Sequence, residues 1–115
     1  MSNPVELLER LSTVRGLRGS VLVSAADGLI VAESLMTGVD GRAVAALAAS
    51  LMNRLRRATE CAGRKEPVFL QLQAQSGSVL ATPCGAELVL VAVAGPDANV
   101  GLARLEMLEA AGRLV

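Results

Sequence analysis

One segment near the carboxyl end constrains the fold more than any other. The expected strand Glu87–Ala94 contains the run Leu-Val-Leu-Val-Ala-Val-Ala, which has no polar residue on either face. Side chains of a strand alternate between two faces, so a strand of this kind has to be covered on both. We therefore predict a central strand with helices on both sides of its sheet. The 115 residues suffice for one such domain, 1–115, and are too few for a second core.

The remaining patterns predict an α/β (α+β) fold in the order α-β-β-α-β-β-β-α. Its five-stranded antiparallel sheet carries the two outer helices on one face and the long central helix on the other. The helices are expected after the capping residues Asn3, Asp40 and Asn99, and the first is expected to end at Gly16. The last runs over Gly101–Leu114. The other four strands are predicted at Ser20–Ala25, Leu29–Ser34, Val68–Ala74 and Val79–Cys84.

Asp27-Gly28 lies between the first two expected strands, and this dipeptide is a strong signal for a hairpin turn. Asp27 has an alternative interpretation as a metal ligand or catalytic acid. No second carboxylate lies near it in the sequence, which favours the turn.

The long central helix carries two kinds of surface. A stripe of apolar residues at helical spacing is expected to hold it on the sheet, while its other faces carry alanine where a solvated helix normally has charges. Helix propensity alone would explain these alanines, and a second buried contact with another copy of the chain is the alternative that we favour. The stripe is Val44, Leu47, Ala48, Leu51, Leu55 and Ala58, and the second surface is Ala43, Ala45, Ala46, Ala49, Ser50 and Met52.

The strand Val68–Ala74 alternates apolar residues with Phe69, Gln71 and Gln73, as expected of an edge strand. It contains neither a charge nor a proline, the features that usually protect a free edge from pairing. We therefore expect it to pair with a second subunit.

Basic residues gather at the end of the central helix, at Arg54, Arg56, Arg57, Arg64 and Lys65. Cations at a helix C-terminus complement its macrodipole, and a rim that attracts an acidic protein is the functional alternative.

Arg104 falls on the expected apolar face of the last helix, among Leu105, Leu108 and Ala111. We expect its stem to lie over the core with its head in water. An ion pair or an interface role is the alternative.

Composition excludes several kinds of site. The chain has no histidine, tyrosine or tryptophan, and Phe69 is the one aromatic residue. It therefore lacks histidine bases, histidine metal ligands and aromatic base-stacking platforms. Eleven basic residues balance eleven acidic ones, so no global field favours nucleic acid. We predict no catalytic residues, no metal and no cofactor.

Cysteine usage and the N-terminus bear on the compartment. Cys61 and Cys84 are expected to be buried, reduced thiols, although one disulfide stays an alternative. No signal peptide is visible, and no apolar run reaches the ~20 residues that span a bilayer. We expect a cytoplasmic protein without direct membrane insertion. Ten of the eleven basic residues are arginine, which hints at a GC-rich bacterial genome.

The order of these elements, together with specific segments, resembles the Roadblock family, the dynein light chain relatives that include bacterial MglB-like regulators of Ras-like GTPases. The resemblance covers about Val5 to Leu114. The segments that carry it are Arg18–Ser24, Asp27–Ala32, Ala45–Leu51, Val79–Pro83 and Asn99–Leu102.

The resemblance implies a profilin-like sandwich and a non-enzymatic adaptor. Family members pair through their central helices and third strands and bind small GTPases. Carried over, it implies a homodimer and a Ras-like GTPase partner. The chain departs from the gliding-motility members in one respect, since we expect a bare domain without their terminal extensions. The implied dimer-forming residues are Ala45, Ala49, Met52, Arg56, Phe69, Gln71 and Gln73. The implied partner surface is Arg42, Asn53 and Arg57.

Two other functions compete with the adaptor. The first is a small-molecule sensor, since related sheets in sensor proteins hold ligands, but few polar groups converge in the expected core. An enzyme with Cys84 or Ser50 as nucleophile is the weakest hypothesis, since no histidine is present to activate either. The chain has no GxxxxGK[ST] loop with which to bind GTP itself.

Overall fold

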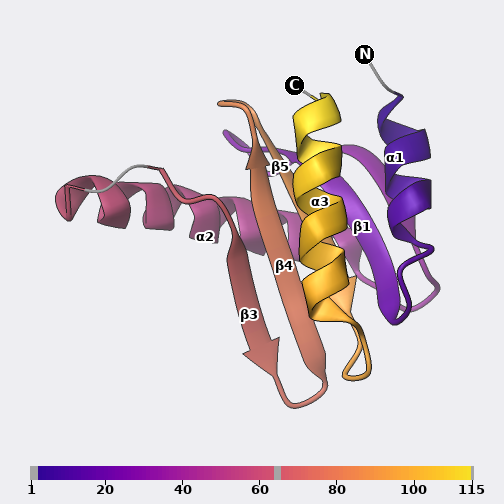
Figure 1. Ribbon diagram of the computed structural model, residues 1–115. Coiled ribbons are helices and arrows are strands. Elements are labelled where there is room, and N and C mark those ends of the chain that lie inside the picture. Colours follow the sequence, from indigo (N-terminus) through magenta and orange to yellow (C-terminus); the bar gives the residue numbers. More distant parts are fainter. Residues whose placement is uncertain (1–2, 64–65, 115) are drawn as a thin grey trace.

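A five-stranded antiparallel sheet organises the chain in the computed structural model, which describes residues 3–63 and 66–114 (Figure 1). The strands lie in the order β2-β1-β5-β4-β3, and every neighbouring pair is antiparallel. The predicted central position of the last strand is confirmed. The strands are β1 (Leu17–Ser24), β2 (Ile30–Leu35), β3 (Leu70–Ala74), β4 (Gly77–Cys84) and β5 (Leu88–Ala94).

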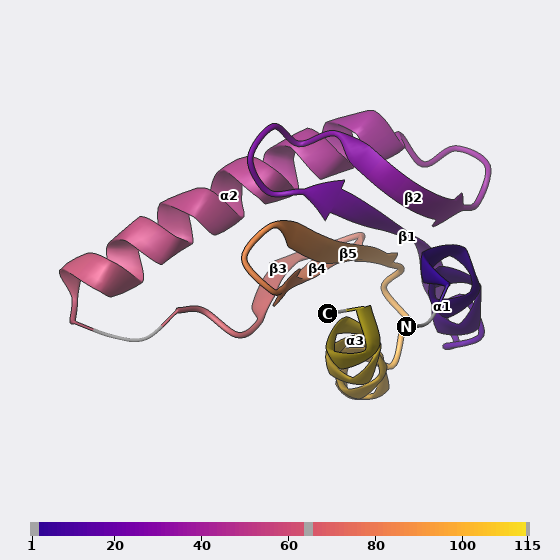
Figure 2. The same ribbon diagram turned by 90° about the horizontal axis from the view of Figure 1, so that it is seen from above.

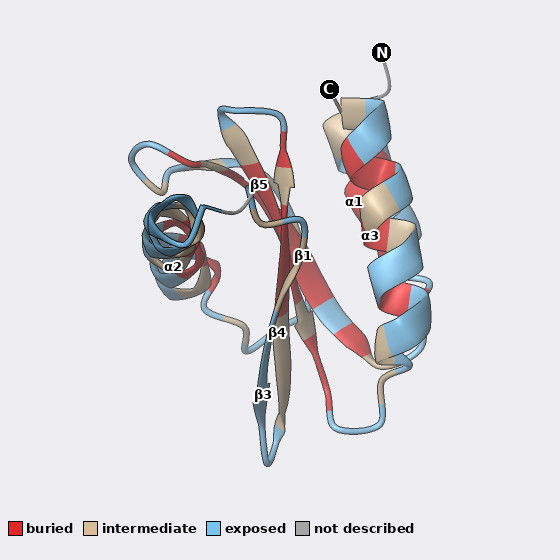
Figure 3. Cartoon of the chain, turned by 60° about the vertical axis from the view of Figure 1, so that its left-hand side comes forward, coloured by how far each residue is buried: buried red, intermediate tan, exposed pale blue. Residues whose placement is uncertain are grey.

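Three helices cover the two faces of this sheet, as predicted. Helices α1 (Pro4–Leu11) and α3 (Val100–Leu114) lie together on one face, and α2 (Gly41–Cys61) lies alone on the other (Figure 2). Figure 3 shows the resulting three layers, with buried residues concentrated where the helices meet the sheet. Among the described residues, none of these helices has the length and apolar character needed to cross a membrane.

The predicted helix starts are confirmed by side-chain caps. The Oδ1 atoms of Asn3, Asp40 and Asn99 accept hydrogen bonds of 2.9–3.1 Å from backbone N–H groups two or three residues later. The predicted end of α1 at Gly16 is wrong, because the helix ends at Leu11. The Ser12 and Thr13 hydroxyls donate to carbonyls of its last turn and so favour its termination.

The Asp27-Gly28 turn is also confirmed. Asp27 Oδ1 accepts the Leu29 N–H at 3.1 Å, and Gly28 has a φ of +73°. A Cβ at Gly28 would lie 3.3 Å from the Ala46 Cα atom, so α2 passes close over the turn. Glycine therefore serves both the turn and the approach of the helix.

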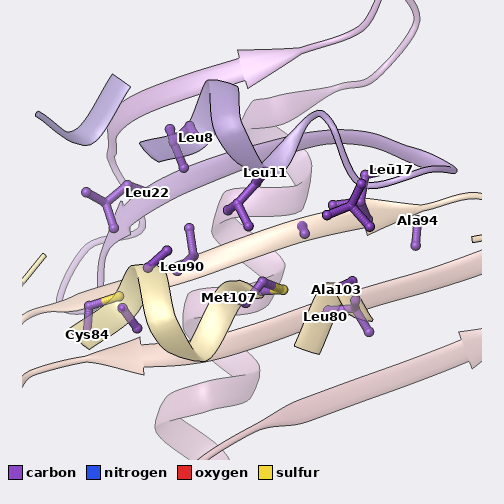
Figure 4. Packing of buried hydrophobic residues seen from close by; sticks show 14 residues of the cluster. Leu8, Leu11, Leu17, Leu22, Leu80, Cys84, Leu90, Ala94, Ala103 and Met107 are labelled. Atoms are coloured by element: carbon purple, nitrogen blue, oxygen red, sulfur yellow. The ribbon is translucent and has the colours of Figure 1, made fainter. Parts of the chain in front are cut away.

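The core consists of two clusters, one on each side of the sheet. Between the sheet and α1 and α3, Leu8, Leu90 and Met107 are fully buried members of one cluster (Figure 4). Under α2, the cluster joins Val21, Val23, Val89 and Val91 of the sheet to small residues of the helix. β5 contributes to both clusters, which explains why its sequence is apolar throughout.

The apolar face of α3 was only partly predicted. Its buried residues are Ala103, Met107, Ala110 and Ala111, whereas Leu105 is 67% exposed. The Arg104 guanidinium lies 5.3 Å from the centre of the Phe69 ring, a cation–π contact between α3 and the segment before β3. Glu109 and Arg113, four residues apart on the exposed side of α3, form an ion pair at 2.8 Å.

Candidate self-association surface

Helix α2 packs on its own sheet through small residues and one methionine. Ala45 and Met52 have no exposed surface, and Ala49 is 4% exposed. They contact the valines of the sheet, within the same cluster as Ala48. The prediction that Ala45, Ala49 and Met52 form an uncovered face is therefore wrong. Short side chains let the helix lie close to the sheet, and this intramolecular contact buries them.

The side of α2 that is not covered by the sheet carries the larger apolar residues of the helix, where the sequence pattern predicts alanines. Of the stripe predicted to face the sheet, only Ala48 is buried, and Leu47 is 65% exposed. Val44 and Leu51 are half-buried beside Leu70, Leu72 and Val79 of the sheet. We call these six residues the α2–β3 face: Val44, Leu47, Leu51, Leu70, Leu72 and Val79.

The α2–β3 face encloses an apolar groove of about 160 Å³, whose floor includes Ala48 and Ala81. Ligand pockets usually hold about 300–1,000 Å³ and contain polar groups that orient the ligand. This groove is smaller, and its lining is entirely apolar. Its size and chemistry suit an inserted apolar side chain better than a metabolite.

The backbone edge next to this groove is open. In the described residues, β3 pairs with β4 alone, and Leu70–Ala74 carries no charge or proline. The other sheet edge, β2, differs because it carries Glu33 and lies opposite a register shift between Leu22 and Val23 of β1. Charges and bulges hinder edge pairing. β3 is therefore the less protected of the two edges.

Three predicted interface residues lie in or next to β3. Gln71 and Gln73 are exposed, on the face opposite to Leu70 and Leu72. Phe69 is half-buried and packs on the cluster under α3. That Gln71 and Gln73 contribute to a dimer stays a prediction, and it requires that the backbone of β3 pairs with a second copy. Phe69 already contacts Arg104 within the same chain.

The predicted partner surface is only partly on the outside of α2. Arg42 and Arg57 are exposed. Asn53 is half-buried, and its Nδ2 donates a 2.9 Å hydrogen bond to the Ala25 carbonyl, so it holds the β1–β2 turn against the helix. Arg56, which was assigned to the dimer interface and not to the partner surface, is half-buried, and its role in a dimer stays a prediction. Arg64 and Lys65 of the predicted basic cluster lie outside the described residues.

The two thiols differ in their exposure to solvent. Cys84 is buried, and burial raises the pKa of its thiol from 9.0 to about 11, an effect that a backbone hydrogen bond to Leu90 reduces. The prediction that Cys61 is buried is wrong, because it lies exposed at the end of α2. Both cysteines are free. Among residues 3–63 and 66–114, no group of three metal-ligating side chains is present.

Comparison with known proteins gives consistent matches. The family model for the Roadblock/LC7 domain matches residues 5–94. The uncharacterized protein MJ0310 of Methanocaldococcus jannaschii is 29% identical over 108 residues, which are 94% of this chain and 93% of that protein.

Solved structures agree in fold. The Roadblock/LC7 domain from Streptomyces avermitilis has a TM-score of 0.88 at 22% identity, over 98% of this chain and 95% of that one. Myxococcus xanthus MglB has a TM-score of 0.87 at 20% identity, over 96% and 90%. A structure of MglB with a tetrameric arrangement gives 0.87 at 20% identity, over 99% and 89%.

Proposed function

The chain belongs to the Roadblock/LC7 domain family, and we propose from this premise that it is a non-catalytic cytoplasmic adaptor, a homodimer that binds a Ras-like small GTPase. The α2–β3 face carries the proposal, because there an exposed apolar groove lies beside an unprotected strand edge. A contiguous apolar patch of this kind usually marks a protein interface.

A second copy of the chain can cover both the apolar groove and the open edge of β3. In a twofold interface the same patch meets itself. Two antiparallel β3 strands would then pair at their edges and extend the sheet, while α2 of each copy would lie near the groove of the other. The tetrameric arrangement of MglB, a protein with the same fold, supports self-association in general.

The homodimer is tested by Leu47→Glu, with Leu29→Glu as the matched control. The two leucines are 65% and 66% exposed, but Leu29 directly precedes β2, at the opposite edge of the sheet from the α2–β3 face. In sedimentation equilibrium at micromolar concentration, we expect the wild type and Leu29→Glu to be dimers and Leu47→Glu to be a monomer with unchanged helix content. A monomeric wild type, or a dimeric Leu47→Glu, contradicts the proposal.

The GTPase partner is inferred from the family resemblance and from the surface of α2. This helix carries four arginines and one glutamate, in a chain with equal numbers of basic and acidic residues. Arg42, Arg54 and Arg57 are exposed and can attract an acidic protein surface.

Direct binding tests this second part. Ras-like GTPases encoded in the same genome are purified, loaded with GDP or a non-hydrolysable GTP analogue, and titrated with the chain by calorimetry. We expect one of them to bind with different affinities in the two nucleotide states. The absence of binding in both states for every such GTPase contradicts the proposal and leaves the homodimer untouched.

A further inference from the structure

Next to α2, on the side away from β3, an open cleft of about 330 Å³ lies between the helix and two turns of the sheet. The β1–β2 turn contributes Ala25 and Ala26 to its lining, and the β4–β5 turn contributes Ala86 and Glu87. Ser24 of β1 and two residues one helical turn apart on α2, Asn53 and Arg56, complete the lining.

The Arg56 guanidinium has an unusual environment. Its Nε and Nη2 atoms are removed from solvent and have no hydrogen-bond partner within the described part of the chain. These two nitrogens form one edge of the planar group, the pair of parallel donors that matches a carboxylate. Charged donors that are buried without an acceptor are unfavourable. Arg56 already lines the cleft, so a change of its side-chain rotamer is enough for these donors to meet an acceptor that enters the cleft.

The frame of the cleft is already fixed. Asn53 donates to the Ala25 carbonyl at 2.9 Å, and the Ala25 N–H donates to the Glu87 carbonyl at 2.8 Å. These bonds connect α2 to both turns. Glu87 contributes the one carboxylate among the lining residues, and it forms no ion pair with Arg56.

We propose that Arg56 binds an acidic side chain, glutamate or aspartate, of a protein partner that lies along α2. The inference rests on the proposed function, since it assigns a contact to the partner surface of α2. Exposed Arg57 adds positive charge on the same turn of the helix, which favours a carboxylate over a neutral group. Glu87 is expected to oppose binding, because it places a like charge near the incoming carboxylate.

A peptide titration tests this contact without the GTPase. The probe is acetyl-Gly-Glu-Gly-amide, and acetyl-Gly-Gln-Gly-amide is the matched neutral peptide. The readout is the Nε–Hε resonance of Arg56 in ¹⁵N-labelled protein, identified by its loss in Arg56→Lys. We expect a saturable shift with the glutamate peptide only. Arg56→Lys lacks this resonance and is followed through the side-chain amide of Asn53 in the same cleft. It should bind the peptide about fivefold more weakly because it loses the paired donors, and Glu87→Gln should bind about threefold more tightly.

Several outcomes overturn the assignment. Equal shifts with both peptides mean that water or a neutral group satisfies Arg56. If Glu87→Gln is less stable than the wild type and binds the peptide no more tightly, Glu87 forms an ion pair with Arg56 in solution. Saturation by inorganic phosphate but not by the peptide means a small-anion site. None of these results bears on dimer formation, which sedimentation decides separately.

Discussion

Gly77 is a single residue on which the β3–β4 hairpin depends. It has a φ of +146°, and a Cβ added there would lie 2.2 Å from the Ala94 carbonyl oxygen. We predict that Gly77→Ala lowers the free energy of unfolding by about 2–4 kcal/mol, because backbone strain and a steric clash add. Urea unfolding monitored by circular dichroism measures this change.

Gly112 is the matched control, since it lies in α3 with open space around its Cα atom. Gly112→Ala is expected to raise the unfolding free energy by up to about 1 kcal/mol, because alanine favours a helix. Equal effects of the two substitutions would mean that the contact of Gly77 with β5 is not as close as the structure shows.

The two cysteines are expected to differ sharply in reactivity. A thiol reacts as its thiolate, and Cys84 is buried with a pKa of about 11, whereas Cys61 is exposed. With iodoacetamide at pH 8, we predict rapid modification of one equivalent per chain in the native protein and of two in urea. Mass spectrometry locates the label, and Cys61→Ser serves as the control. Rapid labelling of Cys84 in the folded Cys61→Ser protein contradicts its burial.

At the scale of the element, the orientation of α2 means that the same substitution should affect stability differently at two neighbouring positions. Ala49 faces the sheet, whereas Ser50 faces solvent. Ala49→Glu should lower the unfolding free energy by about 3 kcal/mol or more, because it buries an unpaired charge. Ser50→Glu should change it by less than about 0.5 kcal/mol. If Ala49→Glu keeps full stability and only dissociates the dimer, the alanine face is the interface after all.

For α2, the sequence predicts where the helix begins but not which of its faces packs on the sheet. Caps and turns depend on neighbouring residues, so Asp40 and Asp27-Gly28 could be assigned from the sequence. The rotation of α2 could not, because alanines and leucines form adjacent apolar stripes and periodicity does not say which one meets the sheet. The close approach of Ala46 to Gly28 decides it. Two distant parts of the chain make that contact, so a pattern within the helix cannot reveal it.

At the scale of the whole molecule, self-association should appear in thermal stability. A dimer gains stability with concentration by mass action. We predict that the melting temperature of the wild type rises by about 3 °C for each tenfold increase in concentration. That of Leu47→Glu should stay constant. Differential scanning calorimetry measures both, and a concentration-independent wild type contradicts the homodimer.

The sheet order follows from the sequence more directly than the interface does. Leu88–Ala94 is apolar on both faces, and Leu70–Ala74 is half polar, which places the first in the centre and the second at an edge. The open edge was therefore predictable. The residues beside it were not, because the α2–β3 face depends on the rotation of the helix. The Arg56 cleft likewise requires two turns and a helix to meet, and nothing in the local sequence around Arg56 marks it.

The arrangement of the layers has a practical consequence. Asn3 begins the cap of α1 and Leu114 ends α3, and both helices lie behind the sheet, opposite to α2 (Figure 3). A fluorescent protein or purification handle joined at Asn3 or Leu114 therefore starts on the face of the sheet opposite to the groove and to the arginines of α2. Reporter fusions can follow the protein in living cells while its contacts remain unobstructed.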